Sequence, residues 1–318
     1  MRLRNDSPLV LFLVVLLFTP GAASADMLKS DAGAAVSPAA LTMYSTQGSW
    51  VEKDGNNGYK GKQVGGYFMR EDVFNAATRV GTLYGFTHRD LNFNNSRNKE
   101  QQNISSFGGY VSYRIGDWVF SDTLMYILGL HNAQYYTNAG RIRADYSSND
   151  FRNNFNISYV LKRANLTIVP VVGFIYDHIK VNAHKDSTDN RCGEVSEDLY
   201  RITTGVRMKS ENKIKSVRIE PFMNVNGEWG KHPDNADRQC TVVEIGTTIE
   251  VGQTADMKIF YAGSVSNGTR THGGGLGFNF KKFNAVVEAT YSGGLFGKNN
   301  MTNNTTANVA GIRAVINF

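Results

Sequence analysis

Most of the chain alternates apolar and polar residues one by one, in segments bounded by clusters of Asn, Asp, Gly and Thr. In one of them, Thr241 and Val243 fall on one face of an extended strand, while Val242 and Glu244 fall on the other. This period-two pattern predicts an all-β protein. Fourteen segments follow it: 40–50, 60–69, 74–90, 103–114, 118–136, 146–160, 165–181, 197–209, 216–229, 240–250, 256–265, 271–280, 284–292 and 306–318.

The connections between these segments alternate in length, which separates a barrel from a soluble sandwich. Tight turns are expected at Arg70 to Val73, Ile115 to Asp117, Leu161 to Ala164, Ser210 to Lys215, Val251 to Ala255 and Lys281 to Phe283. Longer polar loops are expected at Leu91 to Gln102, Thr137 to Asp145, Asn182 to Ser196 and Gly293 to Thr305. Short turns at one end and long loops at the other are typical of outer-membrane barrels. Residues 40–318 are therefore predicted to form a transmembrane antiparallel up-and-down β-barrel of twelve to fourteen strands, with both ends on the periplasmic side.

The N-terminus has the pattern of a secretory signal peptide. Arg2 and Arg4 precede an apolar run at 9–18, and Ala23-Ser24-Ala25 offers a small-residue cleavage site. As a helix the run rises only about 15 Å, against a hydrocarbon thickness of about 30 Å, so a membrane anchor is disfavoured. We predict a signal peptide at 1–25 and a short segment at 26–39, periplasmic or in the pore. The mature chain is expected in the outer membrane of a Gram-negative bacterium.

Composition supports the all-β interpretation. After residue 25 the chain contains 12 Leu and 30 Asn, which is poor in helix formers and rich in turn residues. No later stretch has 18 consecutive apolar residues, so a helical membrane protein is excluded. The formal charge of +6 becomes +5 once Arg2, Arg4 and Asp6 are removed, and no basic cluster lies behind it. Nucleic-acid binding is therefore not expected.

The last segment combines alternation with a terminal aromatic residue. Ile312, Ala314, Ile316 and Phe318 fall on one face, and Arg313 falls on the other. A terminal Phe closing an amphipathic strand resembles the C-terminal assembly signal of bacterial outer-membrane proteins. We therefore assign Ile312, Ile316 and Phe318 as a signal read by the barrel-assembly machinery.

These segments together resemble the autotransporter β-domain family. The resemblance rests on residues 81–86 (GTLYGF), 109–114 (GYVSYR), 167–170 (TIVP), 205–207 with 219–221 (GVR and IEP), and 311–318. It implies a barrel of twelve strands, an N-terminal segment in the pore and a passenger exported through it. The chain departs from this pattern in two ways: fourteen segments are counted, and only residues 26 to about 40 precede the barrel, so no passenger is expected.

Assigning the apolar face to lipid places charges of both signs in the lumen. We expect opposite charges to pair across a narrow barrel and to leave at most a small aqueous path. A charge-lined selective channel is the alternative. The charges predicted to face the lumen are Arg79, Arg201, Arg207, Arg218, Glu220, Glu228, Glu244, Glu250, Lys258, Glu288 and Arg313.

Catalytic and metal sites are not expected. Asp177 and His178 are neighbours on a strand and point to opposite faces, and no Ser is placed by sequence to complete a triad with His131. Asp186 and Asp189 could bind Ca²⁺ weakly, although their spacing is not that of an EF-hand and a solvated loop is the simpler interpretation. We predict no enzyme activity, no cofactor and no metal.

Two cysteines, Cys192 and Cys240, follow the signal peptide. The compartment beyond the inner membrane is oxidising, and both residues fall on the long-loop side in adjacent hairpins. We therefore predict a disulfide between them, with two independent free thiols as the alternative.

The function predicted from sequence is a structural or surface-interaction role through the extracellular loops, with a small-solute channel as the alternative. The expected partners are outer-membrane lipid, the barrel-assembly machinery and a host or cell-surface ligand. The protein is expected to be a monomer.

Replacing Phe318 with Ser should lower the amount of folded barrel in the membrane, because the terminal strand presents its apolar face to the assembly machinery. Val315→Ser, on the opposite face, should have a much smaller effect. Heat-modifiable gel mobility of membrane fractions measures the folded fraction. Equal losses from the two variants would show that the facing of this strand is wrong.

Overall fold

The computed structural model describes residues 41–53, 59–93, 97–137, 140–215, 217–231, 237–266, 269–281, 285–293 and 307–317. The expectations for residues 1–25, 26–39 and Phe318 lie outside these residues. Nearly all of the described chain is β-strand, arranged in one antiparallel sheet of sixteen strands and a separate two-stranded hairpin. In the described part of the chain, no helix is long and apolar enough to span a membrane.

Fourteen of the sixteen sheet strands in the described ranges are long and follow one another around the sheet. They are β1 (Leu41–Lys53), β2 (Tyr59–Val73), β3 (Thr78–Phe93), β4 (Lys99–Ile115), β5 (Trp118–Thr137), β6 (Gly140–Tyr159), β8 (Leu166–Val181), β11 (Val195–Ser210), β13 (Val217–Lys231), β14 (Asp237–Val251), β15 (Ala255–Ser266), β16 (Thr269–Phe280), β17 (Ala285–Gly293) and β18 (Ala307–Asn317). The remaining two, β7 (Leu161–Arg163) and β12 (Asn212–Ile214), extend the turns before β8 and β13. The separate hairpin consists of β9 (His184–Lys185) and β10 (Arg191–Cys192).

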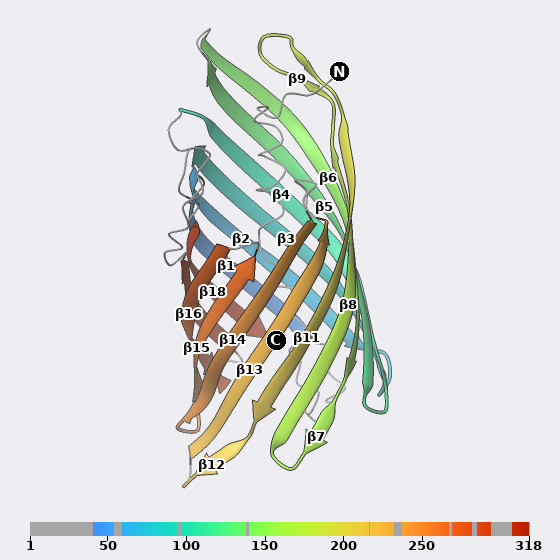
Figure 1. Ribbon diagram of the computed structural model, residues 1–318, viewed down its shortest axis with the longest axis vertical. Helices are drawn as coiled ribbons and strands as arrows, with labels where there is room; N and C mark the ends of the chain where they lie inside the picture. Colours follow the sequence, from blue (N-terminus) through green and yellow to red (C-terminus); the bar gives the residue numbers. More distant parts are fainter. Residues whose placement is uncertain are drawn as a thin grey trace.

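The long strands form a closed ring. Each pairs antiparallel with the strands before and after it, β8 pairs with β11, and β1 pairs with β18, from Met43 opposite Asn317 to Lys53 opposite Ala307. Figure 1 shows the strands inclined around a common axis, with β18 beside β1. The predicted up-and-down barrel is confirmed, and its strand count lies at the upper end of the predicted range rather than at the twelve that the resemblance implies.

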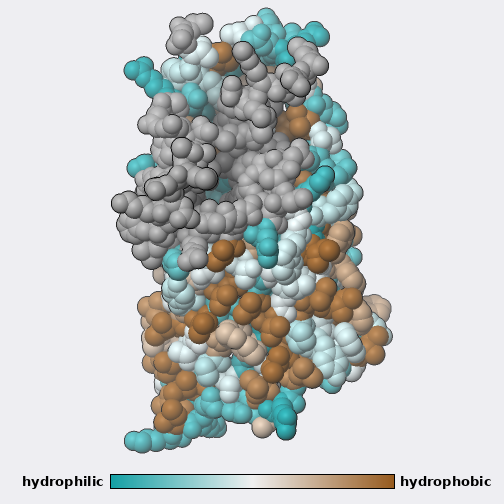
Figure 2. Space-filling view, in the orientation of Figure 1, coloured by the Kyte–Doolittle hydropathy of each residue, from teal (hydrophilic) through white to brown (hydrophobic). Residues whose placement is uncertain are grey.

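The outer face of the barrel is apolar over its middle. On β3, Val80, Tyr84 and Phe86 are exposed, whereas Leu83 and Thr87, which alternate with them, are buried. The same alternation continues on β4 to β6, β8 and β11, so that large apolar side chains gather outside. Figure 2 shows such residues over the middle and lower part of one face, with hydrophilic residues at the bottom edge. Such an apolar belt is the surface that a membrane-spanning barrel presents to lipid.

The strands on one side rise well beyond the apolar belt. On β5 the outward residues are mostly apolar from Trp118 to Leu130 and turn polar at Asn132. That stretch is long enough for a tilted transmembrane strand, which needs about 9–11 residues. β5 and β6 have 20 residues each, so their upper parts stand above the belt.

Two of the predicted long loops are therefore mostly strand. The stretch expected as a loop at 91–102 contains the end of β3 and the start of β4, and that at 137–145 contains the start of β6. Strands pair through their backbone groups, so a ladder can continue through polar residues wherever both faces of the sheet are in contact with water. Polarity marks the end of the belt rather than the end of the strand.

One tight turn lies four residues later than predicted. β2 continues through Val73, and the turn falls at 74–77. The side-chain oxygen of Asn75 accepts hydrogen bonds from the backbone N–H groups of Ala77 and Thr78, at 2.9 and 2.8 Å. This Asn turn, rather than the charged residues before it, sets the position of the reversal.

Ile245 faces outward on β14 and is 51% exposed, whereas Val242 faces the lumen and is 37% exposed. Ile245→Arg should lower the free energy of unfolding by about 2–4 kcal/mol, because it places a cation in hydrocarbon. Val242→Arg should lower the free energy of unfolding much less, since the residues around Val242 are polar and in contact with water. Urea unfolding in lipid vesicles measures both. A larger loss for Val242→Arg would reverse the assignment of the two faces.

Candidate functional site

Strand register places the predicted lumen charges on the face opposite the apolar belt. Arg201, for example, lies opposite Gly230 on β13 and shares its face with Glu228. The positions concerned are Arg79, Arg201, Arg207, Arg218, Glu220, Glu228, Glu244, Glu250 and Lys258, while the predictions for the side chains of Glu288 and Arg313 lie outside what the structure describes. Glu288 and Arg313 are register partners on β17 and β18. Candidate chemistry therefore lies on the inner wall.

The inner-wall ion pairs that the structure describes run along the wall. Arg79 Nη1 lies 3.3 Å from Glu71 Oε1 of β2, and Lys258 Nζ lies 3.1 Å from Glu244 Oε1 of β14. The expectation that opposite charges would pair across the lumen is corrected by these contacts. Neighbouring strands are only about 4.8 Å apart, so a long side chain reaches the next strand before it reaches the far wall.

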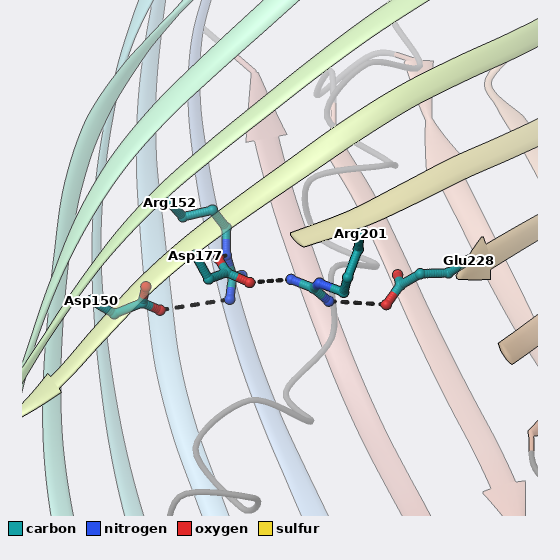
Figure 3. Close-up of polar contacts among 5 residues, drawn as sticks. All are labelled: Asp150, Arg152, Asp177, Arg201 and Glu228. Atoms are coloured by element: carbon teal, nitrogen blue, oxygen red, sulfur yellow. Dashed lines mark hydrogen bonds and ion pairs between the residues drawn. The ribbon is translucent and has the colours of Figure 1, made fainter. Parts of the chain in front are cut away.

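Five charged side chains from four adjacent strands form a lateral network on the inner wall (Figure 3). Arg152 of β6 places Nε 2.5 Å from Asp177 Oδ1 of β8, and its Nη2 lies 3.6 Å from Asp150 Oδ2. Arg201 of β11 binds the other oxygen of Asp177 and donates to Glu228 Oε1 of β13 at 3.0 Å. Asp177 therefore joins two arginines, and the network ties β6, β8, β11 and β13 together.

This network is largely withdrawn from solvent. The Asp177 side chain is fully buried, and those of Arg152 and Arg201 are 22% and 15% exposed. Desolvated charges are stable only when each has a partner, so removing the central carboxylate would leave two guanidinium groups short of theirs. The network fixes the local spacing of the strands and fills the wall with paired charge.

A second polar cluster lies beyond the apolar belt, at the level where the outward-facing residues are polar. Arg89 of β3 donates from Nε to Gln63 Oε1 of β2 at 3.1 Å and from Nη1 to Gln102 Oε1 of β4 at 3.3 Å. Gln102 Nε2 in turn donates to Glu100 Oε1 at 2.9 Å. All four side chains are buried. They connect three adjacent strands through a continuous set of hydrogen bonds.

Glu100 connects this chain to β5 and β6. Its Oε1 lies 2.8 Å from His131 Nδ1 and accepts from the Tyr146 hydroxyl at 2.9 Å. His131 Nε2 lies 2.9 Å from Ser148 Oγ. The His131 and Glu100 side chains have no exposed surface, and the His131 ring stacks on Tyr146 at 4.5 Å with a 4° interplanar angle. A carboxylate, an imidazole and a hydroxyl are therefore held in a line.

Sequence reasoning singled out His131 but missed Ser148 and Glu100. The three residues come from three strands, and register brings them together: His131 lies opposite Tyr146, and Gly129 lies opposite Ser148. The available signal was the alternation itself, which places Glu100 and Ser148 on the inward face of their strands. The register between two strands cannot be read from the sequence of either strand alone.

Asp177 and His178 point to opposite sides of the wall, as expected for neighbours on a strand. His178 faces outward, where its Nδ1 lies 2.8 Å from Asp198 Oδ1. Asp177 belongs to the inner network. They therefore do not share a site.

Asp186 stabilises a turn in the β9–β10 hairpin. Its carboxylate accepts from the hydroxyl and backbone N–H of Thr188 and from the backbone N–H of Asn190. The Thr188 hydroxyl, with help from these N–H groups, holds the pKa of Asp186 below its usual value. Asp189 pairs with Lys185 at 3.3 Å. Among the described residues, no group of three or more His, Cys, Asp or Glu is placed to hold a metal ion.

The structure holds Cys192 and Cys240 as free thiols, so the predicted bridge is not formed. The loop after β8 turns toward β6, where Asp186 forms a bridge with Ala144 and brings the β9–β10 hairpin with it. Cys240 lies on β14, beyond β11 and β13 in the ring. The up-and-down order of the strands places both cysteines at the same end of the barrel. The loop after β8, however, turns toward β6 and so carries Cys192 away from Cys240. Burial raises the pKa of the Cys192 thiol.

The geometry agrees with what comparison with known proteins finds. The family model "Autotransporter beta-domain" matches residues 40–281. The chain belongs to the autotransporter β-domain family, as the sequence resemblance indicated. No curated protein matches it.

Solved structures of similar fold include autotransporter barrels. The translocator domain of NalP from Neisseria meningitidis has a TM-score of 0.62 at 12% identity, covering 93% of this chain and 97% of that one. The β-domain of the Bordetella autotransporter BrkA has a TM-score of 0.57 at 13% identity, covering 86% and 99%. A Pseudomonas aeruginosa FadL homologue has a TM-score of 0.57 at 8% identity, covering 87% and 90%. The protein is an outer-membrane barrel of a Gram-negative bacterium.

Asp177→Ala should lower the free energy of unfolding by about 3–5 kcal/mol, because it leaves Arg152 and Arg201 without their shared carboxylate. Asp198→Ala, which removes the exposed partner of His178, should leave stability nearly unchanged because water replaces the lost contact. Urea unfolding of the folded barrel compares the two. Equal losses would mean that the inner network contributes no more than a surface pair.

Proposed function

We propose that this translocator-type barrel acts at the cell surface through its extracellular rim, with a lumen that does not serve as an open solute channel. The observation that carries the proposal is the ordered polar structure above the apolar belt. This polar wall consists of the upper parts of β3 to β6 together with the β9–β10 hairpin, at residues 88–93, 99–103, 131–137, 140–149 and 184–192.

The outer surface of the polar wall is tied together by side-chain pairs between neighbouring strands. They are His88 with Asn103 at 2.8 Å, Gln101 with Asp90 at 3.0 Å, Asn132 with Asp145 at 2.6 Å and Arg141 with Gln134 at 2.6 Å. Each is solvent-exposed, so each pair contributes little to stability. Their effect is to hold polar groups in fixed positions, which lowers the entropy lost when a partner binds.

The β9–β10 hairpin is fixed to this wall. The backbone N–H of Ser187 donates to the carbonyl of Arg143 at 2.8 Å, and the Ser187 hydroxyl accepts from the Arg143 N–H at 2.9 Å. Figure 1 shows the hairpin at the same end as the tall β5 and β6. The rim therefore offers a preorganised polar surface rather than separate loops.

The inner wall supports the second part of the proposal. Arg89, Gln102, His131 and Asp177 face the lumen and are buried. Their hydrogen bonds and ion pairs would have to break before a polar solute could use them. Outer-membrane lipid around the belt and the barrel-assembly machinery are the other partners that we propose.

In planar bilayers, the purified full chain should show no steady conductance steps of the size given by a general porin measured in parallel.

Bacteria that display the chain should adhere to cultured epithelial cells several-fold better than bacteria displaying a variant whose residues 184–192 are replaced by a Gly-Ser linker. The physical reason is that the variant removes a fixed part of the polar wall while leaving the belt intact.

Heat-modifiable mobility serves as the control that both proteins are folded and present in equal amounts. Porin-sized conductance together with unchanged adherence would favour the small-solute channel and would contradict the proposal.

A further inference from the structure

The Ser148, His131 and Glu100 side chains have the connectivity of a nucleophile, a base and an orienting carboxylate. A carboxylate only accepts hydrogen bonds, so the His131 Nδ1 that lies 2.8 Å from Glu100 Oε1 carries a proton. In the uncharged ring, Nε2 is then an acceptor and receives the Ser148 hydroxyl at 2.9 Å. This is the arrangement that activates serine for attack on a carbonyl carbon.

The base is held rigidly. Gln102 and Tyr146 donate to the same Glu100 oxygen as His131, each at 2.9 Å, and Tyr146 also stacks on the imidazole. Arg89 donates to Gln102, which in turn donates to Glu100. Glu100 and Ser148 hold the two ring nitrogens of His131 in place, and an uncharged imidazole in this position is the form that accepts a proton.

The strand opposite Ser148 leaves room for its hydroxyl. A Cβ on Gly129 would lie 2.4 Å from Ser148 Oγ and 2.6 Å from His131 Nε2, so any side chain at this position would collide with the contact between them. Glycine lets Ser148 lean across its register partner and reach His131, which is diagonal to it. The contact depends on the absence of a side chain at one position.

One further feature distinguishes this cluster from one that only seals the wall, namely a pocket beside it. The pocket has a volume of about 440 Å³. His131 and Tyr146 line it together with Leu130 and His184, among others, whereas Ser148 is not among its lining residues, so a substrate in the pocket meets His131 first. That volume suits a small organic molecule.

We propose that Ser148 and His131 are the catalytic residues of a serine-hydrolase site at the polar wall, that Glu100 is the positioning residue for His131, and that the substrate is a small uncharged carboxylic ester. The proposal departs from the expectation of a barrel without enzyme activity, and it does not depend on the proposed surface role.

The reaction uses water as its only co-reactant. Ser148 Oγ forms a bond to the ester carbonyl carbon as its proton passes to His131 Nε2, and that proton then leaves with the alcohol as the ester C–O bond breaks. Water next attacks the acyl group on Ser148 and gives one proton to His131. The carboxylic acid departs as Ser148 Oγ regains a proton.

The test uses the full-length folded barrel in detergent, a fluorophosphonate probe and p-nitrophenyl butyrate. The probe should form an adduct that peptide mass spectrometry locates on Ser148, and the ester should be hydrolysed. Ser148→Ala should abolish both, and His131→Gln should lower the hydrolysis rate about 10²- to 10⁴-fold. Ser121→Ala, which alters another buried serine of the inner wall, should leave both unchanged.

Glu100→Gln should lower kcat with KM nearly unchanged, and Glu100→Asp should recover part of the loss, which a purely structural role for Glu100 would not produce. Heat-modifiable mobility shows whether each variant folds. Folded wild-type protein that gains no adduct at Ser148 would overturn the proposal. Hydrolysis that persists in folded Ser148→Ala would overturn it as well.

Discussion

The rest of this structure depends on one constraint: each backbone N–H and C=O group in hydrocarbon needs a partner within the protein. A sheet meets that demand only when its edges join, and here β1 joins β18 through a continuous antiparallel ladder. Closure gives every long strand two neighbours and divides its side chains between lipid and lumen. The two-residue alternation of the sequence thereby becomes an apolar outside and a polar inside.

Closure also determines how the charges of the inner wall are neutralised. Side chains on adjacent strands are neighbours, so Asp177 is shared between Arg152 and Arg201 rather than paired with the opposite wall. The same logic extends upward, from Arg89 through Gln102 and Glu100 to His131. Lateral networks of this kind cross several strands, and they stiffen the barrel while they reduce the free polar surface of the lumen.

Above the apolar belt the constraint is relaxed, because water can satisfy backbone groups. The strands continue there nonetheless, and polar pairs such as Asn132 with Asp145 hold neighbouring strands in register. The extracellular end is thus an ordered extension of the sheet to which a hairpin is attached. Both proposals draw on this order: surface contact uses the outer face of the wall, and the serine site uses its inner face.

Alternation, turn spacing and the scarcity of leucine were sufficient to predict the barrel, its fourteen segments and the inward face of charges such as Arg201, because these properties belong to single strands. Sequence did not predict where strands end above the belt, because ladder pairing does not require apolar residues. It also did not predict that Cys192 would lie apart from Cys240, or that Ser148 and Glu100 would meet His131. Those outcomes depend on register and on the path of a loop, which exist only once separate strands have been brought side by side.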